Sequence, residues 1–323
     1  MLAYEYIKRN KRRSLILAAL FPISFTLFAF LIIFFIHSLG TIYYYVHSSI
    51  DIVWSKLFSA SFMAAHEWCK IVLPICFALS AFWARIAIKD GGKFVLEYIP
   101  GISPILKLDH FDAFTTLENL CLTAGMPMPD LYELNDDSLN AFATGYNPQN
   151  AALAVTRGLM EKLTPMDLQG VVAHEMAHIG NRDIRLNLLI ITGLGVFYSL
   201  GRFCLRCATR SSGRNDKKGN GGILLICIAI AFLIFNLIVA PLIHLAISRR
   251  REYVADATGA KILHNSKVLA DALEKIAVDS TVEVLVEQKN MAVACIASPF
   301  AGLSNLTSTH PSIEERVRRL RNM

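Results

Sequence analysis

Two histidines and a glutamate within five residues carry the strongest chemical signal in the sequence. His174 and His178 are four positions apart, so on one helix both imidazoles leave the same face and can bind one cation. Glu175 lies beside them and can take a proton from a water molecule on that cation. A histidine pair with this HExxH spacing also occurs by chance on surfaces and in cores. The motif therefore predicts a metal site only together with a well-defined helix and a third ligand.

The helix that must carry the motif has a clear beginning. Thr164 is the predicted N-cap, Pro165 occupies the first helical position, and Asp167 places an acid at the third. The residues directly before the histidines, Val171 to Ala173, are apolar. This pattern indicates that the histidines lie in a folded site rather than on a polar surface.

Glu252 and Asp256 form a second pair with helical spacing further along the chain. Catalytic zinc takes three protein ligands and one water, and two histidines with a glutamate are a common set. Glu252 is the predicted third ligand, and Asp256 can accept the other ring N–H of a ligating histidine. The alternative is a polar face on which both acids pair with the preceding arginines. Because His174 and His178 are present, we expect one Zn²⁺ per chain, with Glu175 as general base.

The overall composition points to a membrane protein. The 323 residues are 54% hydrophobic and 18% charged, whereas a soluble domain is about a quarter charged. The net charge of +6 suits nucleic acid or an anionic membrane face, and the clumping of the apolar residues favours the membrane. We expect no nucleic-acid partner. Seven cysteines, an odd number, argue against a disulfide framework and for a reducing compartment.

Four apolar runs are the candidate membrane helices, at 14–36, 71–88, 186–205 and 223–247. The first holds 23 residues without a charge, enough to cross a hydrocarbon core of about 30 Å. A signal peptide is the alternative for this run, but the run is too long and no cleavage site follows it.

The distribution of basic residues predicts the orientation in the membrane. Five precede the first run and place the N-terminus in the cytoplasm: Lys8, Arg9, Lys11, Arg12 and Arg13. His174 and Glu252 flank the last two runs and must reach one ion, so these runs either both span or both re-enter. Spanning puts the basic linker 206–222 outside, against the positive-inside tendency. We prefer spanning because 223–247 is long enough to cross unaided, and re-entry stays open.

The polar stretches predict a small domain of the α+β class. A helix at 111–124 ends at Gly125, and strands follow at 130–134, 139–144 and 151–156. We expect a membrane-anchored zincin domain with a small sheet, the HExxH helix and about four transmembrane helices. The predicted parts are an N-terminal transmembrane hairpin, a first catalytic part, the last two apolar helices and a second catalytic part, at 1–88, 89–185, 186–247 and 248–323.

Other residues are predicted to handle the substrate or support the site. Asn140, Ala141, Phe142 and Ala143 suit an exposed sheet edge to which an extended substrate adds as a strand; the alternative is an ordinary edge strand packed under a loop. His310 is the predicted donor to the oxyanion, or else a helix cap or surface residue. The charged C-terminal tail that contains Arg316 is predicted to be a solvated face. Asp183 either supports the metal site or caps a helix.

Several segments together resemble the HtpX-type integral-membrane zinc metallopeptidases, relatives of the CAAX prenyl endopeptidases. They are 171–183 (VVAHEMAHIGNRD), 248–260 (SRRREYVADATGA), 140–145 (NAFATG), 155–159 (VTRGL), and THP at 309–311 with ER at 315–316. The resemblance implies a gluzincin in a bacterial inner membrane, with its active site facing the cytoplasm. It also implies cleavage of misfolded or damaged membrane proteins in quality control and the stress response. In this family pattern His174, His178 and Glu252 match the zinc ligands, Glu175 the base, and Asp256 the acid behind the site.

The expected function is thus that of a membrane-embedded zinc endopeptidase, whose partners are unfolded or membrane protein substrates and the lipid bilayer. A CAAX prenyl endopeptidase is the alternative enzyme, and the presence of only four apolar runs argues against it. An inactive membrane scaffold is the alternative without activity, and the intact Glu175 argues against that. The sequence does not give the oligomeric state.

Overall fold

The computed structural model describes residues 3–48, 54–97, 99–107, 110–212, 221–246, 250–277 and 311–323. The chain divides into two compact units. The first comprises Met1–Ser14, Ala87–Gly195 and Ile238–Met323, and the second comprises Leu15–Ile86 and Val196–Leu237. The first turns of the N-terminal helix therefore belong to the same unit as the HExxH motif.

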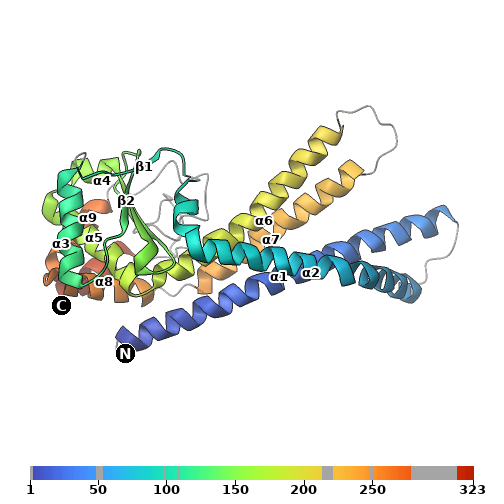
Figure 1. The fold of residues 1–323 in the computed structure, drawn as a ribbon, viewed down its shortest axis with the longest axis horizontal. Helices are drawn as coiled ribbons and strands as arrows, with labels where there is room; N and C mark the ends of the chain where they lie inside the picture. Colours follow the sequence, from blue (N-terminus) through green and yellow to red (C-terminus); the bar gives the residue numbers. More distant parts are fainter. Residues whose placement is uncertain are drawn as a thin grey trace. The chain divides into compact units, whose positions relative to one another are not determined.

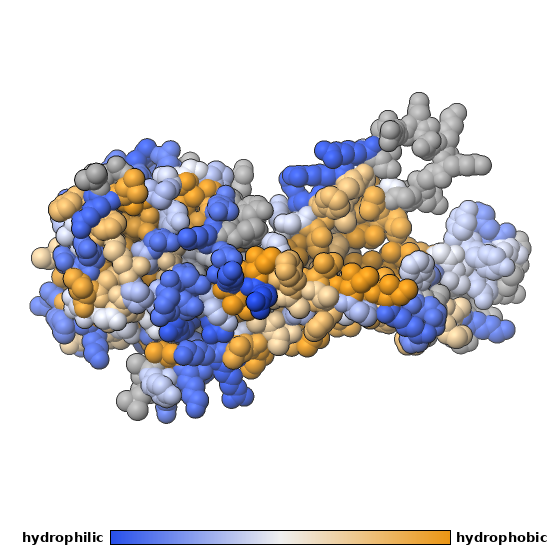
Figure 2. Space-filling view, viewed as in Figure 1, coloured by the Kyte–Doolittle hydropathy of each residue, from blue (hydrophilic) through white to orange (hydrophobic). Residues whose placement is uncertain are grey.

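The second unit contains most of the apolar helices α1 (Ala3–His47), α2 (Trp54–Glu97), α6 (Asp183–Ser212) and α7 (Gly221–Ala246), each of which has one end in the first unit. Apolar side chains gather over the surface of these helices (Figure 2). Within the described residues, three helices are long and apolar enough to cross a membrane, over Tyr4–His47, His66–Asp90 and Asp183–Arg210. In α7 the described apolar part is shorter, Leu224–Phe235.

The helices extend beyond the predicted apolar runs. The first run was expected at 14–36, but α1 continues through the aromatic residues that follow it to His47. The predicted linker 206–222 is shorter than expected because α6 continues to Ser212, without a glycine or proline after Gly201 to interrupt it. Polar flanks thus continue a helix when nothing in the sequence breaks it.

Phenylalanine rings pack the helices of the second unit together. The ring centroid of Phe28 on α1 lies 4.9 Å from that of Phe232 and 4.9 Å from that of Phe235, both on α7. Phe197 on α6 is 4.4 Å from Phe235. Aromatic pairs at this separation attract one another beyond simple burial, so this cluster joins three of the four helices.

The first unit contains a four-stranded sheet in the order β1-β2-β4-β3 (Figure 1). The strands are β1 (Ile102–Pro104), β2 (Asp130–Leu134), β3 (Ala141–Gly145) and β4 (Ala151–Thr156). β2 pairs in parallel with β4, and the outer pairs β1–β2 and β3–β4 are antiparallel. Strands 130–134 and 151–156 are confirmed. β3 begins at Ala141 rather than at residue 139, because the Asn140 N–H bonds to the Thr156 hydroxyl instead of to a strand carbonyl.

Helices cover both faces of this mixed sheet. On one face Leu153 of β4 packs with Leu117 of α3 (Phe111–Ala124) and Val171 of α5 (Pro165–Gly180). On the other face Phe142 of β3 packs with Leu188 near the start of α6 and with the end of α2. The remaining described elements are η1 (Pro148–Asn150), α4 (Arg157–Lys162), α8 (Arg250–Leu263), α9 (Ser266–Ile276) and α11 (Ile313–Arg321). The fold is mostly helical with one small mixed sheet.

Local sequence signals set the ends of the helices that carry the site. Gly125 ends α3 in the left-handed region, at φ 62°, as its position predicts. Thr164 and Asp167 form the reciprocal capping box at the start of α5, with Pro165 in the first turn. These predictions are confirmed, and they place the HExxH segment on a firmly capped helix.

Helices α5 and α8 lie close together because of one glycine. A Cβ atom on Gly259 of α8 would lie 3.2 Å from both the backbone nitrogen and the Cα of His174. The absence of a side chain therefore lets α8 approach the backbone of the HExxH helix itself.

Candidate metal centre

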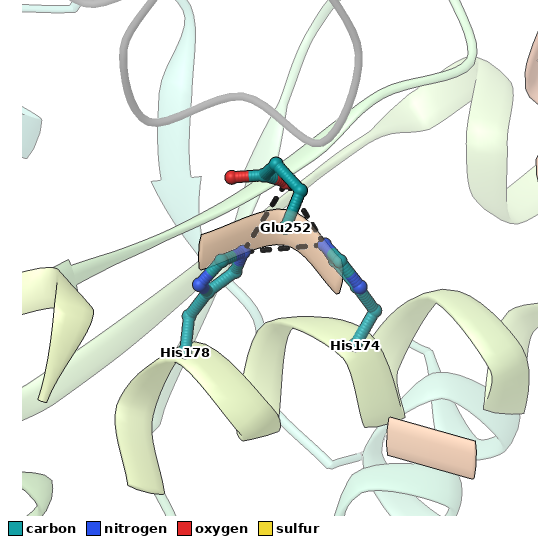
Figure 3. A group of neighbouring side chains, drawn as sticks. All are labelled: His174, His178 and Glu252. Carbon is teal, nitrogen blue, oxygen red and sulfur yellow. Dashed lines mark hydrogen bonds and ion pairs between the residues drawn. The ribbon is translucent and has the colours of Figure 1, made fainter. Parts of the chain in front are cut away.

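Three predicted metal ligands meet between α5 and α8 (Figure 3). The Nε2 atoms of His174 and His178 are 3.2 Å apart. Glu252 points at them from α8, with its Oε2 3.6 Å from Nε2 of His174 and 3.7 Å from Nε2 of His178. All three side chains are buried, with His174 fully so. The fold thus brings residues from distant parts of the chain to one point.

The donor set and its spacing fit a transition-metal ion. Two nitrogens at about 2.0–2.1 Å from one tetrahedral zinc ion lie about 3.3 Å apart, close to the 3.2 Å between the two Nε2 atoms. Two imidazoles with one carboxylate also leave a fourth position open, as catalytic zinc sites do.

Glu175 lies next to these ligands in a dry environment. Its side chain is 1% exposed, and neither carboxyl oxygen makes a hydrogen bond within the described residues. Burial raises the pKa of Glu175, and the neighbouring imidazoles of His178 and His174 only partly oppose this rise. A buried carboxyl with unused acceptors and a raised pKa is suited to accepting and returning a proton.

His174 is held from behind by Asp256. The Nδ1 atom of His174 lies 3.0 Å from Oδ1 of Asp256. Arg316 of α11 donates to both oxygens of that carboxylate, from Nε at 2.9 Å and from Nη2 at 2.7 Å. Burial alone would raise the pKa of Asp256, but Arg316 and His174 outweigh it and lower the pKa to about 2. Asp256 is thus a fixed anion that fits the role of orienting the His174 ring.

The expectation that Arg316 belongs to a solvated face is wrong. Its side chain is fully buried, although the other arginines of α11 are exposed. Arg316 lies three residues after Ile313 and four before Leu320, so its position in the helix directs it to the apolar side. The carboxylate of Asp256 makes burial of its charge tolerable.

His178 is held in the same way by Asp183. Oδ2 of Asp183 lies 2.9 Å from Nδ1 of His178, so this aspartate supports the site rather than only capping a helix. The chain reverses direction after α5 through Arg182, at φ 63°, which brings the start of α6 back to the histidine. Burial lowers the pKa of His178, but Glu252 and Asp183 outweigh it and raise the pKa to about 10.

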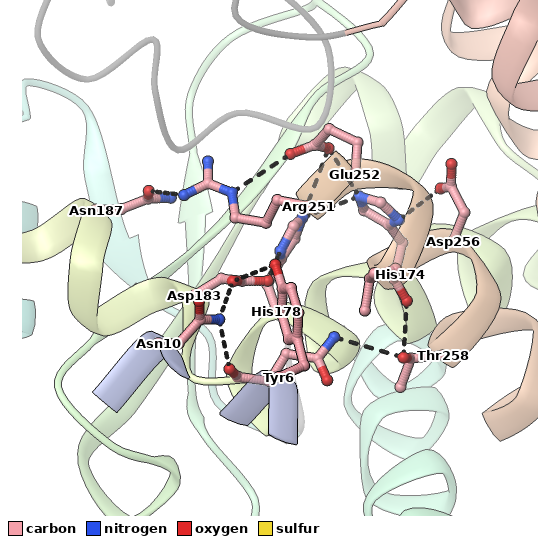
Figure 4. Close-up of polar contacts among 12 residues, drawn as sticks. Tyr6, Asn10, His174, His178, Asp183, Asn187, Arg251, Glu252, Asp256 and Thr258 are labelled. Atoms are coloured by element: carbon pink, nitrogen blue, oxygen red, sulfur yellow. Dashed lines mark hydrogen bonds and ion pairs between the residues drawn. The ribbon is translucent and has the colours of Figure 1, made fainter. Parts of the chain in front are cut away.

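Further polar side chains lie around the metal ligands and these aspartates (Figure 4). Arg251 of α8 donates to Oδ1 of Asn187 on α6 at 2.6 Å. Tyr6 and Asn10 of α1 reach Asp183 from the opposite side of the carboxyl. The sequence analysis considered Arg251 only as a partner of the neighbouring acids, and it did not single out Tyr6, Asn10 or Asn187.

The predicted substrate strand lies beside Glu175, but its surface is not open. β3 is at the end of the strand order, and Asn140, Ala141, Phe142 and Ala143 are all buried, with exposures of 1–3%. The strand was expected at an exposed sheet edge. The structure agrees that β3 is an edge strand, but its residues are buried. His310, the predicted oxyanion donor, lies outside the described residues.

Comparisons with known proteins show what this chain is similar to. Residues 114–323 match peptidase family M48. The "Protease HtpX homolog" of Bacteroides fragilis (strain YCH46) is 39% identical over 233 residues, 69% of this chain and 72% of that protein. The protein of the same name from Syntrophobacter fumaroxidans is 43% identical over 225 residues, 68% of this chain and 79% of that protein. The crystal structure of S. mikatae Ste24p aligns with a TM-score of 0.40 and 17% identity, over 77% of this chain and 64% of that chain.

The matched region includes every residue of the metal centre except those contributed by α1. The resemblance to HtpX-type peptidases is confirmed by these relatives. The chain is therefore a metalloprotease and belongs to peptidase family M48.

Proposed function

We propose that this chain is a zinc-dependent endopeptidase of a bacterial inner membrane, which cleaves misfolded or damaged membrane proteins on the cytosolic side. The single observation that carries the proposal is the buried group of His174, His178 and Glu252 beside the buried carboxyl of Glu175. The apolar helices support a membrane location, and the relatives quoted above are bacterial proteins.

Each site residue has a distinct task in peptide hydrolysis. His174, His178 and Glu252 would hold the ion, which would supply Lewis-acid activation of a water molecule and of the substrate carbonyl. Glu175 accepts a proton from the attacking water and returns it to the leaving amine. Its burial keeps bulk water away from the carboxyl during this transfer. Asp256 and Asp183 accept hydrogen bonds from the Nδ1 atoms, so that both Nε2 atoms face Glu252, where the ion would bind.

Replacing Glu175 separates metal binding from catalysis. Glu175→Gln keeps the three ligands, so we expect the variant to retain zinc, measured by atomic absorption on detergent-purified protein, and to lose cleavage of casein. Glu161→Gln, on the exposed face of α4, is the matched control and should cleave normally. Unchanged turnover in Glu175→Gln would refute the mechanism. Absence of cleavage in the wild type with zinc bound would favour an inactive scaffold.

Strand β3 is the proposed grip for the substrate backbone. The Thr156 N–H donates to the Asn140 carbonyl. In this antiparallel register the backbone N–H of Phe142 therefore points toward β4, and the backbone N–H groups of Ala141 and Ala143 point away from it. The Ala141 N–H is already bonded to the Asn140 side chain. The Ala143 N–H therefore points away from β4 on the side of Glu175, and we propose that an added substrate strand pairs with it there.

Proline substitutions test this assignment because proline removes one N–H. Ala143→Pro should retain the fold and zinc but lose cleavage of an unstructured substrate. Ala141→Pro is the control and should cleave normally, because the Ala141 N–H is bonded to the Asn140 side chain and is not used by the substrate. Phe142→Pro should destabilise the domain because it removes a bond to β4. Normal cleavage by Ala143→Pro would show that β3 does not bind the substrate.

The cytosolic orientation rests on the basic residues that precede the first apolar run. Asn10 contacts Asp183, so the exposed Lys11 in the same turn lies on the same side of the membrane as the metal centre. A cysteine at position 11 in a cysteine-free background should react with an impermeant thiol reagent only from the cytosolic side. Labelling from the periplasmic side would reverse the proposed orientation.

The substrate class is tested in native membranes. Proteins trapped by Glu175→Gln but not by the wild type should be misfolded membrane proteins. Efficient cleavage of a prenylated CAAX peptide would instead support the alternative, a prenyl endopeptidase.

A further inference from the structure

The first turns of α1 present one buried polar stripe. Tyr6, Asn10 and Ser14 are spaced four residues apart and are 6%, 2% and 0% exposed. Lys8, Lys11, Arg12 and Arg13, which lie between them in the sequence, are exposed. Burial of uncharged polar groups on one helix face requires partners for them, and the partners of Tyr6 and Asn10 lie beside the metal centre.

Asn10 holds the junction between the HExxH helix and α6. Its Nδ2 donates to Oδ1 of Asp183 at 2.7 Å and to the carbonyl of Asn181 at 3.0 Å. The Tyr6 hydroxyl donates to the same Oδ1 at 3.3 Å. The other oxygen of Asp183 faces Nδ1 of His178, so α1 and the histidine bind opposite oxygens of one carboxylate (Figure 4).

We propose that Asn10, assisted by Tyr6, is a positioning residue of the metal centre, which fixes the Asp183 carboxylate so that His178 presents Nε2 to the ion. The inference rests on the proposed metal centre and extends it to the N-terminal helix. A ligating imidazole depends on the hydrogen bond at its other nitrogen for its tautomer and ring orientation. A carboxylate held at only one oxygen can rotate, whereas Asp183 is held at both.

The chemistry of the two holders suits this task. Amide and hydroxyl donors satisfy Oδ1 without adding a charge, so Asp183 keeps its full negative charge for His178. A lysine at position 10, like its neighbours in sequence, would neutralise that charge. The fully buried Ser14 donates to the Asn10 carbonyl at 2.8 Å, within the helix, and does not contact Asp183 in the described bonds.

Metal affinity is the decisive measurement, because it does not depend on turnover. In competition with a zinc chelator, the full-length protein in detergent should lose about tenfold in affinity on Asn10→Ala, the lower range for losing an outer partner of a ligand. Tyr6→Phe removes only the longer hydrogen bond to Asp183, at 3.3 Å, and should lower zinc affinity about threefold. Ser14→Ala, the matched control on the same buried stripe, should bind zinc like the wild type.

A double-variant cycle separates positioning from simple docking of the helix. In an Asp183→Asn background, Asn10→Ala should cause little further loss of zinc affinity if it acts through Asp183. Equal losses in both backgrounds would overturn the proposal, as would an Asn10→Ala affinity equal to that of Ser14→Ala. If Asn10→Ala does not fold, the same cycle with Tyr6→Phe decides, with coupling to Asp183 in support and additivity against.

Failure of this inference is distinguishable from failure of the proposed function. If His174→Ala and Glu252→Gln leave zinc affinity unchanged, the metal centre itself is wrong. If those two variants lose zinc while Asn10→Ala and Tyr6→Phe do not, the centre stands and only the role of α1 is refuted.

Discussion

The two histidines of the metal centre are each backed by a buried aspartate, but the two aspartates are held by different chemistry. Behind His174, Asp256 is bound at both oxygens by the guanidinium of Arg316. Behind His178, Asp183 is bound by the neutral groups of Asn10 and Tyr6.

This difference in partners separates two contributions of an aspartate behind a ligating histidine: one to the stability of the fold and one to the proton equilibrium of the histidine. A carboxylate paired with an arginine forms a neutral unit, which can be buried at low cost only while both partners are present. A carboxylate held by amide and hydroxyl groups stays negative toward the histidine. The His174 side is therefore expected to contribute more to folding, and the His178 side more to the proton equilibrium of its ligand.

Removal of Arg316 should have the largest effect. Arg316→Met leaves the carboxylate of Asp256 buried without its cation, and breaking a buried pair costs about 3–5 kcal/mol. Thermal unfolding of the metal-free protein should show this loss. The double variant Arg316→Met with Asp256→Asn should recover much of the stability, because no lone charge remains. A single variant as stable as the wild type would contradict the account of the His174 side.

Neutralising each aspartate should give equal effects on metal and unequal effects on stability. Asp256→Asn and Asp183→Asn should each weaken zinc affinity by about 10–100-fold, measured with a chelator. Asp256→Asn should also lower the unfolding temperature of the metal-free protein, because Arg316 is left buried and unpaired. Asp183→Asn should lower it less, since its holders are uncharged. Equal losses of stability would remove the distinction between the two sides.

The smallest expected effect is a proton released on metal binding. The pKa of His178 is raised to about 10, so its imidazole carries a proton at neutral pH in the metal-free protein, and metal binding must displace it. Zinc affinity should therefore rise as the pH increases toward 10. Calorimetry in two buffers of different ionisation enthalpy should detect the proton, and Asp183→Asn should reduce its amount. An affinity independent of pH would contradict this prediction.

Local structure was predictable from the sequence wherever neighbouring residues decide it. Gly125 ends a helix because it accepts a positive φ, and Thr164 with Asp167 caps one through bonds within a single turn. Strands β2 and β4 were located because a cluster of turn residues follows the first and another precedes the second. The ends of α1 and α6 were not, since hydropathy marks the apolar part of a helix and not its polar continuation.

The surroundings of the metal centre depend on contacts between distant segments of the chain, which patterns of neighbouring residues do not reveal. The ligand roles of His174, His178 and Glu252 stay predictions, now with a geometry that fits them. Arg316 was misplaced because its charge was given more weight than its position on the apolar stripe of α11. Asp183 reaches His178 only because Arg182 adopts a positive φ, and the partner of Asn10 lies in a distant segment.

The close contact between Gly259 and the backbone of His174 limits how far α8 can move relative to α5. Metal–ligand distances must hold within about 0.2 Å, while any side chain at position 259 would press on the backbone of His174 at 3.2 Å. Glu252 lies about two turns away on the same rigid helix, so even a displacement of a few tenths of an ångström at Gly259 would be carried to the carboxylate. The distance between the ligands on α5 and the ligand on α8 is thus set at a position that contacts neither metal nor substrate. A single methyl group at position 259 would move Glu252 away from the distance that metal binding requires.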